Sequence, residues 1–241
     1  MKLYMYCLAE GVDRLHKTPR GVSGAEVRLM KFDDLSVLVS ASSGDVFPVT
    51  RKNAFAHNAV VRSVCKQTTP LPFRFGTLVT EEQLRSYVKT HRQALKAQLA
   101  HVHGCAEMNV RMIRTRGDAP PEPEPERPKQ LGPGTKFLLQ KCREIHGEDW
   151  RAAQTAELSS WLSEKVGKLI RDEKINLVPA EKVVLAKADH LVERVNIPEY
   201  REKMAWAIEE RPELRFMVSG PWPPYSFANI ELEFSRQFGV S

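Results

Sequence analysis

This sequence of 241 residues has no apolar run of about 18 residues or more, the length from which membrane-spanning helices are built. Its first residues are apolar, but Glu10-Gly11-Val12-Asp13-Arg14 follows without the small-residue cleavage site of a signal peptide. Glycine-rich phosphate loops are missing as well, because Gly21-Val22-Ser23-Gly24 lacks the lysine of a P-loop and no Gly-x-Gly-x-x-Gly pattern occurs. We therefore expect a protein that stays in the cytoplasm and has no nucleotide site.

Cysteine and paired carboxylates are also scarce. The four cysteines are widely spaced and form no Cys-x-x-Cys pair, which favours buried free thiols in a reducing compartment. They are Cys7, Cys65, Cys105 and Cys142. Asp33-Asp34 and Glu209-Glu210 are adjacent in sequence, so their carboxylates point in different directions on a helix or a strand. We expect no enzyme activity, and the net charge of +6 favours acidic partners only mildly.

The first half of the chain has the pattern of an α+β domain. Leu3–Leu8 predicts a strand, and two alternating segments around Asp33-Asp34 predict a hairpin. Thr50 can cap a helix over 51–66, for which we expect Ala54, Phe55, Val61, Val64 and Cys65 on or beside the apolar face. A capping box at Thr80 opens a second helix that reaches Val102, and a strand follows over 108–113. We place this domain, with an antiparallel sheet, at residues 1–116.

Residues 117–134 differ in composition from the rest of the chain. Six prolines alternate there with Glu122, Glu124 and Glu126, and little apolar area is present to be buried. Such a segment favours an extended, exposed tether, which we interpret as the linker between two domains.

The second half, residues 135–241, predicts a domain with mixed elements. A helical pattern runs over 135–170, and two strands follow on either side of Pro179. Pro198 suits the first turn of another helix, and Leu214–Val218 reads as the last strand before Gly220. Helix, strand, strand, helix, strand resembles most of a ferredoxin-like unit.

Two groups of histidines are candidate chemical sites. His101, His103 and Cys105 alternate, so in an extended segment they would share a face, and Cys142 and His146 could complete a zinc site. His57 could act as a general base, but no nucleophile or carboxylate stands at a spacing that would serve it. We expect no metal, no cofactor, and a histidine whose hydrogen bonds serve the helix packing.

Nucleic-acid binding is the alternative function. A basic protein with a ferredoxin-like domain can be an RNA-recognition module, and Phe73-Arg74-Phe75-Gly76 is superficially similar to an aromatic-basic RNA motif. The segment lies between prolines and a helix cap, however, and the longer RNA-binding pattern is missing. We therefore favour packing of Phe73 and Phe75 under the helices.

Two motifs carry a family resemblance. Residues 69–77 read Thr-Pro-Leu-Pro-Phe-Arg-Phe-Gly-Thr, the LPFRFG motif, and residues 219–227 read Ser-Gly-Pro-Trp-Pro-Pro-Tyr-Ser-Phe, the GPWPPY motif. Both are in the places where the gas vesicle synthesis proteins GvpF and GvpL carry similar runs, and a weaker similarity joins Tyr4-Met5-Tyr6, Leu38-Val39-Ser40 and a helix that bears His57. The chain thus resembles that family from end to end.

The resemblance implies a non-enzymatic accessory protein of gas vesicle assembly, located in the cytoplasm and at gas vesicles. Its expected partners are the small hydrophobic shell protein and other vesicle proteins, with no nucleic acid and no membrane. An F-like and an L-like role both stay open. The candidate residues for binding a partner or orienting the domains are Pro72, Phe73, Arg74, Phe75, Gly76, Pro221, Trp222, Pro223, Pro224 and Tyr225. Trp222 and Tyr225 are either a packing plug or a direct contact, and we favour the plug.

Overall fold

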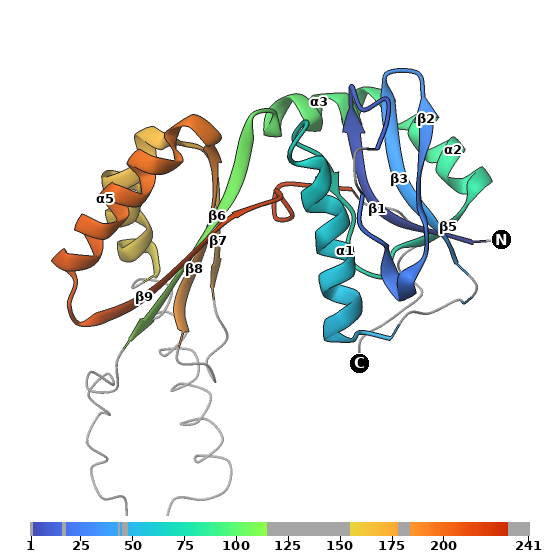
Figure 1. Ribbon diagram of the computed structural model, residues 1–241. Helices are drawn as coiled ribbons and strands as arrows, with labels where there is room; N and C mark the ends of the chain where they lie inside the picture. The colour runs from blue at the N-terminus through green and yellow to red at the C-terminus, as the bar shows by residue number, and fades with distance from the viewer. Residues whose placement is uncertain are drawn as a thin grey trace, which may run out of the picture. The chain divides into compact units, whose positions relative to one another are not determined.

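The computed structural model describes residues 2–15, 18–42, 44, 48–114, 155–177 and 184–230, and Figure 1 shows their helices and strands. These residues form two units. One comprises Met1–Glu107 together with the segment that begins at Pro221, and the other comprises Met108–Gly220. Each unit has its own sheet with antiparallel strand pairs, so the mixed fold with two antiparallel sheets is confirmed.

The sheet of the first unit has the strand order β2-β3-β1-β4, and β5 also pairs with β1. Its elements are β1 (Lys2–Glu10), β2 (Val27–Phe32), β3 (Leu35–Ser42), α1 (Arg51–Val64), β4 (Leu71–Pro72), β5 (Leu78–Thr80), α2 (Glu81–Thr90) and α3 (Arg92–Val102). The predicted hairpin is present as β2 and β3, and β1 runs between β3 and β4 with its residues 3–9 buried. Strand β1 is therefore the centre of this unit.

The expected apolar face of α1 is confirmed at Val61 and Val64, which are buried, but it is wrong at Ala54 and Phe55, which are exposed. The Thr50 hydroxyl accepts a hydrogen bond from the Asn53 N–H at 3.2 Å, so the predicted N-cap is confirmed. Buried positions on α1 are Asn53, His57, Val60, Val61 and Val64. Phe55 is 61% exposed, which contradicts the expected apolar face, because the helix buries a polar asparagine and a histidine that can hydrogen-bond inward.

The long helix expected from Thr80 to Val102 is two helices, α2 and α3, that meet at His91. The predicted capping box is present, with Thr80 and Gln83 each bonding the other's backbone N–H. At the break, the His91 ring stacks on Tyr87 with 4.4 Å between ring centroids, and its Nδ1 lies 3.1 Å from the Tyr87 carbonyl oxygen. The apolar period continues through the break, which is why the sequence did not reveal it.

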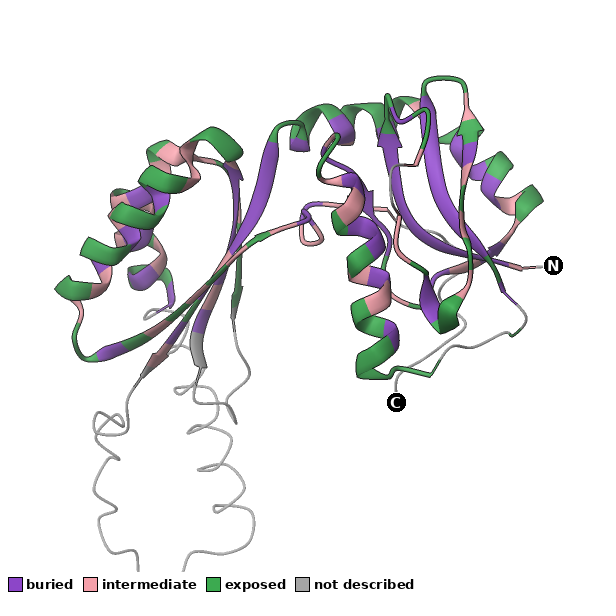
Figure 2. Cartoon of the chain, viewed as in Figure 1, coloured by how far each residue is buried: buried purple, intermediate pink, exposed green. Residues whose placement is uncertain are grey.

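The second unit has the strand order β7-β8-β6-β9. Its elements are β6 (Cys105–Arg114), a helix over 155–166, η2 (Gly167–Leu169), β7 (Ile170–Leu177), β8 (Val184–Glu193), η3 (Arg194–Asn196), α5 (Ile197–Glu210) and β9 (Leu214–Trp222). Figure 1 shows α5 and the helix over 155–166 on the same face of this sheet. Buried residues of that helix and of α5, among them Leu158, Leu162 and Met204, pack on Met108 and Val110 of β6. Figure 2 shows purple, buried positions on both layers.

The composition of the two units differs from the predicted domains. We expected the strand over 108–113 in the N-terminal domain, but β6 pairs in the second sheet, because the alternation that marks a strand does not say which sheet it joins. Residues 117–134 lie outside the described ranges. The elements on either side of them, β6 and the helix over 155–166, pack into the same core of the second unit.

Two element ends also differ from the prediction. The helix expected to reach Ile170 ends at residue 166, and Ile170 begins β7. The last strand continues through Gly220 and Pro221 to Trp222. Proline is tolerated there because β9 is at the edge of its sheet, where an N–H is not needed for pairing. Within the described ranges, no helix is long and apolar enough to cross a membrane.

Candidate functional site

The LPFRFG motif forms the edge of the first unit's sheet. Its β4 pairs with β1, with Cys7 opposite Pro72, and the Phe73 N–H donates to the Tyr6 carbonyl oxygen at 2.9 Å. Pro70 and Pro72 are buried but need no ladder partner, because an edge strand leaves one row of backbone groups unpaired. The predicted packing of Phe73 is confirmed, since its side chain is 2% exposed.

A turn after Phe73 brings the motif to a tyrosine of β1. Thr77 donates to the Arg74 carbonyl oxygen from its N–H at 3.2 Å and from its hydroxyl at 2.7 Å. Gly76 has a φ of 86°, a conformation that favours glycine, and its N–H donates to the Tyr4 hydroxyl at 3.1 Å. Arg74 and Gly76 are exposed, and Phe75 is half-buried. The turn therefore directs Phe75 inward and leaves its neighbours at the surface.

His57 of α1 connects the two motifs. Its Nδ1 lies 2.9 Å from the Tyr4 hydroxyl, and its ring packs against Tyr4, Tyr6, Phe75 and Tyr225 with centroid distances of 5.7, 5.6, 5.9 and 6.2 Å. We name these five side chains the aromatic cluster. Because Tyr4 accepts from Gly76, its own proton is available to Nδ1.

The aromatic cluster is uncharged at neutral pH. Burial lowers the pKa of His57 to about 4, and the Phe73 backbone opposes the shift in part. Burial also raises the pKa of the Tyr4 and Tyr225 hydroxyls, so both remain protonated. The His57 Nε2 atom is buried and has no hydrogen-bond partner of ordinary geometry among the described residues. The general-base interpretation gains no support, since the described contacts of the ring are the Tyr4 hydroxyl, which burial keeps protonated, and aromatic side chains.

The GPWPPY motif folds into consecutive turns against α1. The Tyr225 N–H donates to the Pro223 carbonyl oxygen at 2.8 Å, and the Ala228 N–H donates to that of Pro224 at 3.0 Å. Both prolines are buried. The Tyr225 hydroxyl lies 3.5 Å from Oδ1 of Asn58, and the Arg62 guanidinium lies over the Trp222 ring, 5.8 Å from its centroid. Trp222 is half-buried and Pro221 is exposed.

Two polar side chains of the first unit hold the rest of this segment. Glu107, 4% exposed, accepts from the Ser226 N–H at 2.7 Å and from its hydroxyl at 2.9 Å. Gln98 of α3 exchanges two hydrogen bonds with the backbone of Asn229, at 3.0 and 3.1 Å, as a neighbouring strand would. Phe227 between them is 5% exposed.

The structure thus brings together Phe75 and Tyr225 of the predicted residues, through the His57 ring. Sequence reasoning missed Tyr6, which packs on the same ring, and Asn58, which contacts Tyr225. It also missed Glu107 and Gln98, which bind Ser226 and Asn229. The spacing of two between Tyr4 and Tyr6 of β1 was the one available signal, since same-face positions of a buried strand meet the same neighbours. The glutamate and glutamine lie far along the chain from the motif and carry no local signal.

His101, His103 and Cys105 do not share one face of an extended segment. His101 lies within α3, His103 caps it, and both are exposed, whereas Cys105 is buried in β6. Cys142 and His146 lie outside the described residues. Within the described ranges, no group of three or more His, Cys, Asp or Glu side chains could hold a metal ion.

Comparisons with known proteins agree on one family. The family model described as gas vesicle synthesis protein GvpL/GvpF matches residues 2–229. The chain is 26% identical to gas vesicle protein L of Streptomyces sp. strain CB03234, over 95% of this chain and 94% of the relative, and 26% identical to gas vesicle protein F1 of Halobacterium salinarum, over 98% and 97%. The crystal structure of gas vesicle protein GvpF from Microcystis aeruginosa superposes with a TM-score of 0.76 at 18% identity, over 95% of this chain and 99% of the other.

Proposed function

The chain belongs to the gas vesicle GvpL/GvpF family, and from this premise we propose that it is an assembly factor that binds the small hydrophobic shell protein. Membership itself supports a role in gas vesicle assembly. To this role the proposal adds that the chain binds the shell protein and other vesicle proteins. Its physical rationale is that shell subunits bury apolar surface when they polymerise, so a protein that holds them beforehand prevents other contacts.

One observation supports this proposal most directly: both motifs that carry the family resemblance converge on α1. Phe75 and Tyr225 both pack against the ring of His57, and the Arg62 guanidinium lies over the Trp222 ring. These contacts fix both motifs against α1. We propose that Pro72–Gly76 and Pro221–Tyr225 support the binding surface on α1 and fix the course of the chain where it passes from β9 back to the first unit.

We further propose that Met108–Gly220 is a ferredoxin-like unit. The strand order β7-β8-β6-β9, with a helical segment after β6 and another after β8, supports this. Compared with the sequence prediction, the unit gains β6 as its first strand and gives up the residues after Gly220.

A non-enzymatic role in the cytoplasm and at gas vesicles fits the rest of the site. His57 and Tyr4 of the aromatic cluster are neutral and share a hydrogen bond, which suits packing rather than acid–base chemistry.

Co-purification tests the proposal. The tagged full chain is expressed together with the untagged shell protein, and the shell protein is expected to be retained at moderate salt after nuclease treatment. Retention of nucleic acid in place of the shell protein would favour the alternative, an RNA- or DNA-binding protein, and an affinity that falls steeply with salt would identify it. If neither is retained, the proposed function is wrong.

A further inference from the structure

The outward side of α1 carries an aromatic ring between two arginines. Arg51, Phe55 and Arg62 follow one another at steps of four and seven residues, so they share one face of the helix, opposite to buried His57 and Val60. Phe55 is 61% exposed, and the Arg51 guanidinium lies 5.5 Å from its ring centroid. At the other end, Arg62 covers the ring of Trp222. We name Arg51, Phe55 and Arg62 the α1 outer stripe.

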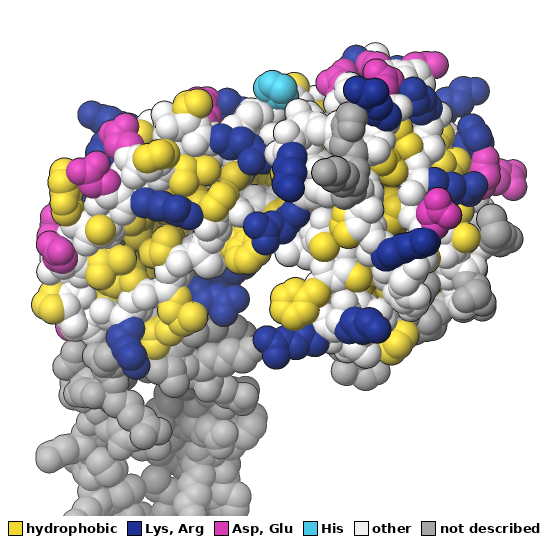
Figure 3. Space-filling model, viewed as in Figure 1, with side chains coloured by type: hydrophobic (Ala, Val, Ile, Leu, Met, Phe, Trp, Pro, Cys, Tyr) yellow, Lys and Arg dark blue, Asp and Glu magenta, His cyan; other side chains and the backbone are white. Residues whose placement is uncertain are grey.

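The charge around this stripe is of one sign. Between Val46 and Thr80 the sequence has five basic residues and no acidic one. Arg51, Lys52, Arg62 and Lys66 make no ion pair with any residue that the structure describes. Figure 3 shows dark-blue and yellow side chains, without magenta ones, over α1 on the visible face.

Some basic side chains elsewhere in the same unit pair with carboxylates, among them Lys31 with Asp13 and Arg85 with Glu81. Arg92 of α3 pairs with Asp33 and Asp34, and Lys96 pairs with Asp34 at 2.6 Å and with Glu10 at 3.4 Å. The basic side chains of α1 have no such carboxylate partner among the described residues, so their charge is available for a binding partner. Arginine and exposed aromatic side chains are also the residue types that dominate binding energy in protein interfaces.

We propose that the α1 outer stripe is the docking site for an acidic amphipathic helix of the shell protein, an inference that rests on the function proposed above. An apolar side chain of that helix covers Phe55, and carboxylates on either side of it meet Arg51 and Arg62. The eleven residue steps from Arg51 to Arg62 span about 16 Å, or roughly three turns of a partner helix. The Arg62–Trp222 contact ties this surface to the GPWPPY motif.

An acidic protein fits the stripe better than a nucleic acid. Single-stranded nucleic acids bind by stacking bases on open aromatic faces. Here Arg51 lies over the Phe55 ring and Arg62 lies over the Trp222 ring, so both rings already have a guanidinium on one face. Guanidinium groups held in this way present their N–H donors to carboxylates.

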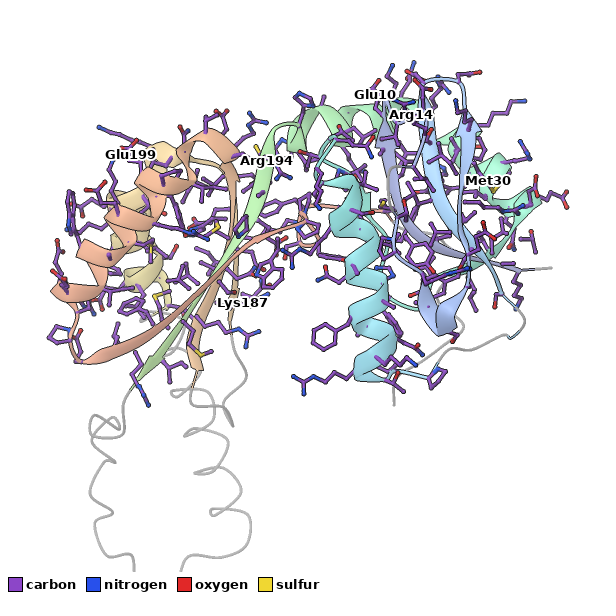
Figure 4. All side chains as sticks on the ribbon, in the orientation of Figure 1. Glu10, Arg14, Met30, Lys187, Arg194 and Glu199 are labelled. Atoms are coloured by element: carbon purple, nitrogen blue, oxygen red, sulfur yellow. The ribbon has the colours of Figure 1, made fainter. Side chains whose placement is uncertain are left out.

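Charge reversal in the full chain tests the inference. Arg51→Glu combined with Arg62→Glu is co-expressed with the shell protein and purified after nuclease treatment. The matched control is Lys89→Glu combined with Arg194→Glu, which makes the same change in net charge at exposed positions on α2 and in the turn before α5, where Figure 4 labels Arg194. We expect the stripe variant to retain at least about tenfold less shell protein and the control to stay within about twofold of the wild type.

Phe55→Ala is the second variant, because it leaves the charge unchanged and removes an exposed ring. It should lower retention of the shell protein severalfold at an unchanged Tm. If the double variant has a lower Tm than the wild type, Phe55→Ala is the variant that tests the docking site. Wild-type retention that both variants preserve would overturn the docking site while the proposed function stands. Retention that nuclease abolishes would assign the stripe to nucleic acid, and a wild type that retains no shell protein would reject both proposals.

Discussion

The carboxylate of Glu107 holds Ser226 by two hydrogen bonds, 2.7 Å to the backbone N and 2.9 Å to Oγ, across 119 positions of sequence. The glutamate is 4% exposed, and both of its oxygens are used. A buried carboxylate is tolerated only where donors replace its water, and here one serine supplies two. This pair therefore fixes the end of the GPWPPY motif against the first unit.

Glu107→Ala should destabilise the protein markedly. It leaves two donors of Ser226 without their acceptor and removes charge-assisted hydrogen bonds, for a loss of about 2–4 kcal/mol in the free energy of unfolding. Urea unfolding measures the difference. Glu107→Gln keeps one acceptor, so its free energy of unfolding should lie between those of the wild type and Glu107→Ala.

The control for this pair is Glu209→Ala, at an exposed position on α5, which should unfold like the wild type. If Glu107→Ala were as stable as this control, the two hydrogen bonds would contribute nothing and the segment would need another anchor.

Gly21 is required by its neighbour Tyr6. The Tyr6 hydroxyl accepts from the Val22 N–H at 2.9 Å and lies 3.0 Å from Oγ of Ser40, so it cannot move freely. A Cβ at Gly21 would lie 1.9 Å from that hydroxyl. We expect Gly21→Ala to cost about 1–3 kcal/mol of stability, as overpacking of a core does.

A double-mutant cycle isolates this clash. Gly21→Ala should cost less in a Tyr6→Phe background, where the hydroxyl is gone, and thermal melts of the four proteins give the coupling. Gly167→Ala is the control, because its Cβ would meet the nearest atom at 3.9 Å. Equal costs of Gly21→Ala in both backgrounds would show that the hydroxyl is not the obstacle.

Local patterns predicted the parts of the fold that local physics determines. The caps at Thr50 and Thr80 depend on residues three positions apart, and both are present. The break at His91 and the partner sheet of β6 depend on packing between distant elements, and both were missed. Period alone also placed Phe55 on the buried side of α1, where the buried hydrogen bond between His57 and Tyr4 instead sets the rotation of the helix.

The candidate site was predicted as two separate motifs, and their meeting point was not. Proline and aromatic residues made both motifs recognisable, because proline has a specific position in turns. Nothing in the sequence relates Ser226 to Glu107, or Asn229 to Gln98, since the spacings exceed any turn of a helix or hairpin. That both motifs pack against α1 follows only from the three-dimensional fold.

His57 should make stability depend on pH. Its pKa is about 4 in the folded protein, below the ordinary value of 6.5, so the unfolded chain takes up a proton first as the pH falls. The stabilisation is complete above about pH 6.5 and is lost as the pH falls toward 4, by up to about 3 kcal/mol.

Urea unfolding at intervals between pH 7 and 4 measures this effect by difference. His57→Gln should lose less stability than the wild type over that range, although it is less stable at pH 7. His103→Gln, at an exposed position, should follow the wild-type curve. Parallel curves for wild type and His57→Gln would mean that His57 does not contribute.

Trp222 distinguishes a packing plug from a direct contact. Its ring is half-buried under Arg62, so Trp222→Ala should cost about half of the roughly 3–5 kcal/mol that a fully buried aromatic costs. A plug predicts a lower Tm together with weaker retention of the shell protein, because α1 loses the support of the GPWPPY motif. A contact predicts weaker retention at an unchanged Tm. We expect the plug.

The control is Trp206→Ala, which removes a tryptophan 59% exposed on α5 and should change neither the Tm nor the retention of the shell protein. A Trp222→Ala protein that keeps both its Tm and its shell-protein retention would contradict either role for this residue.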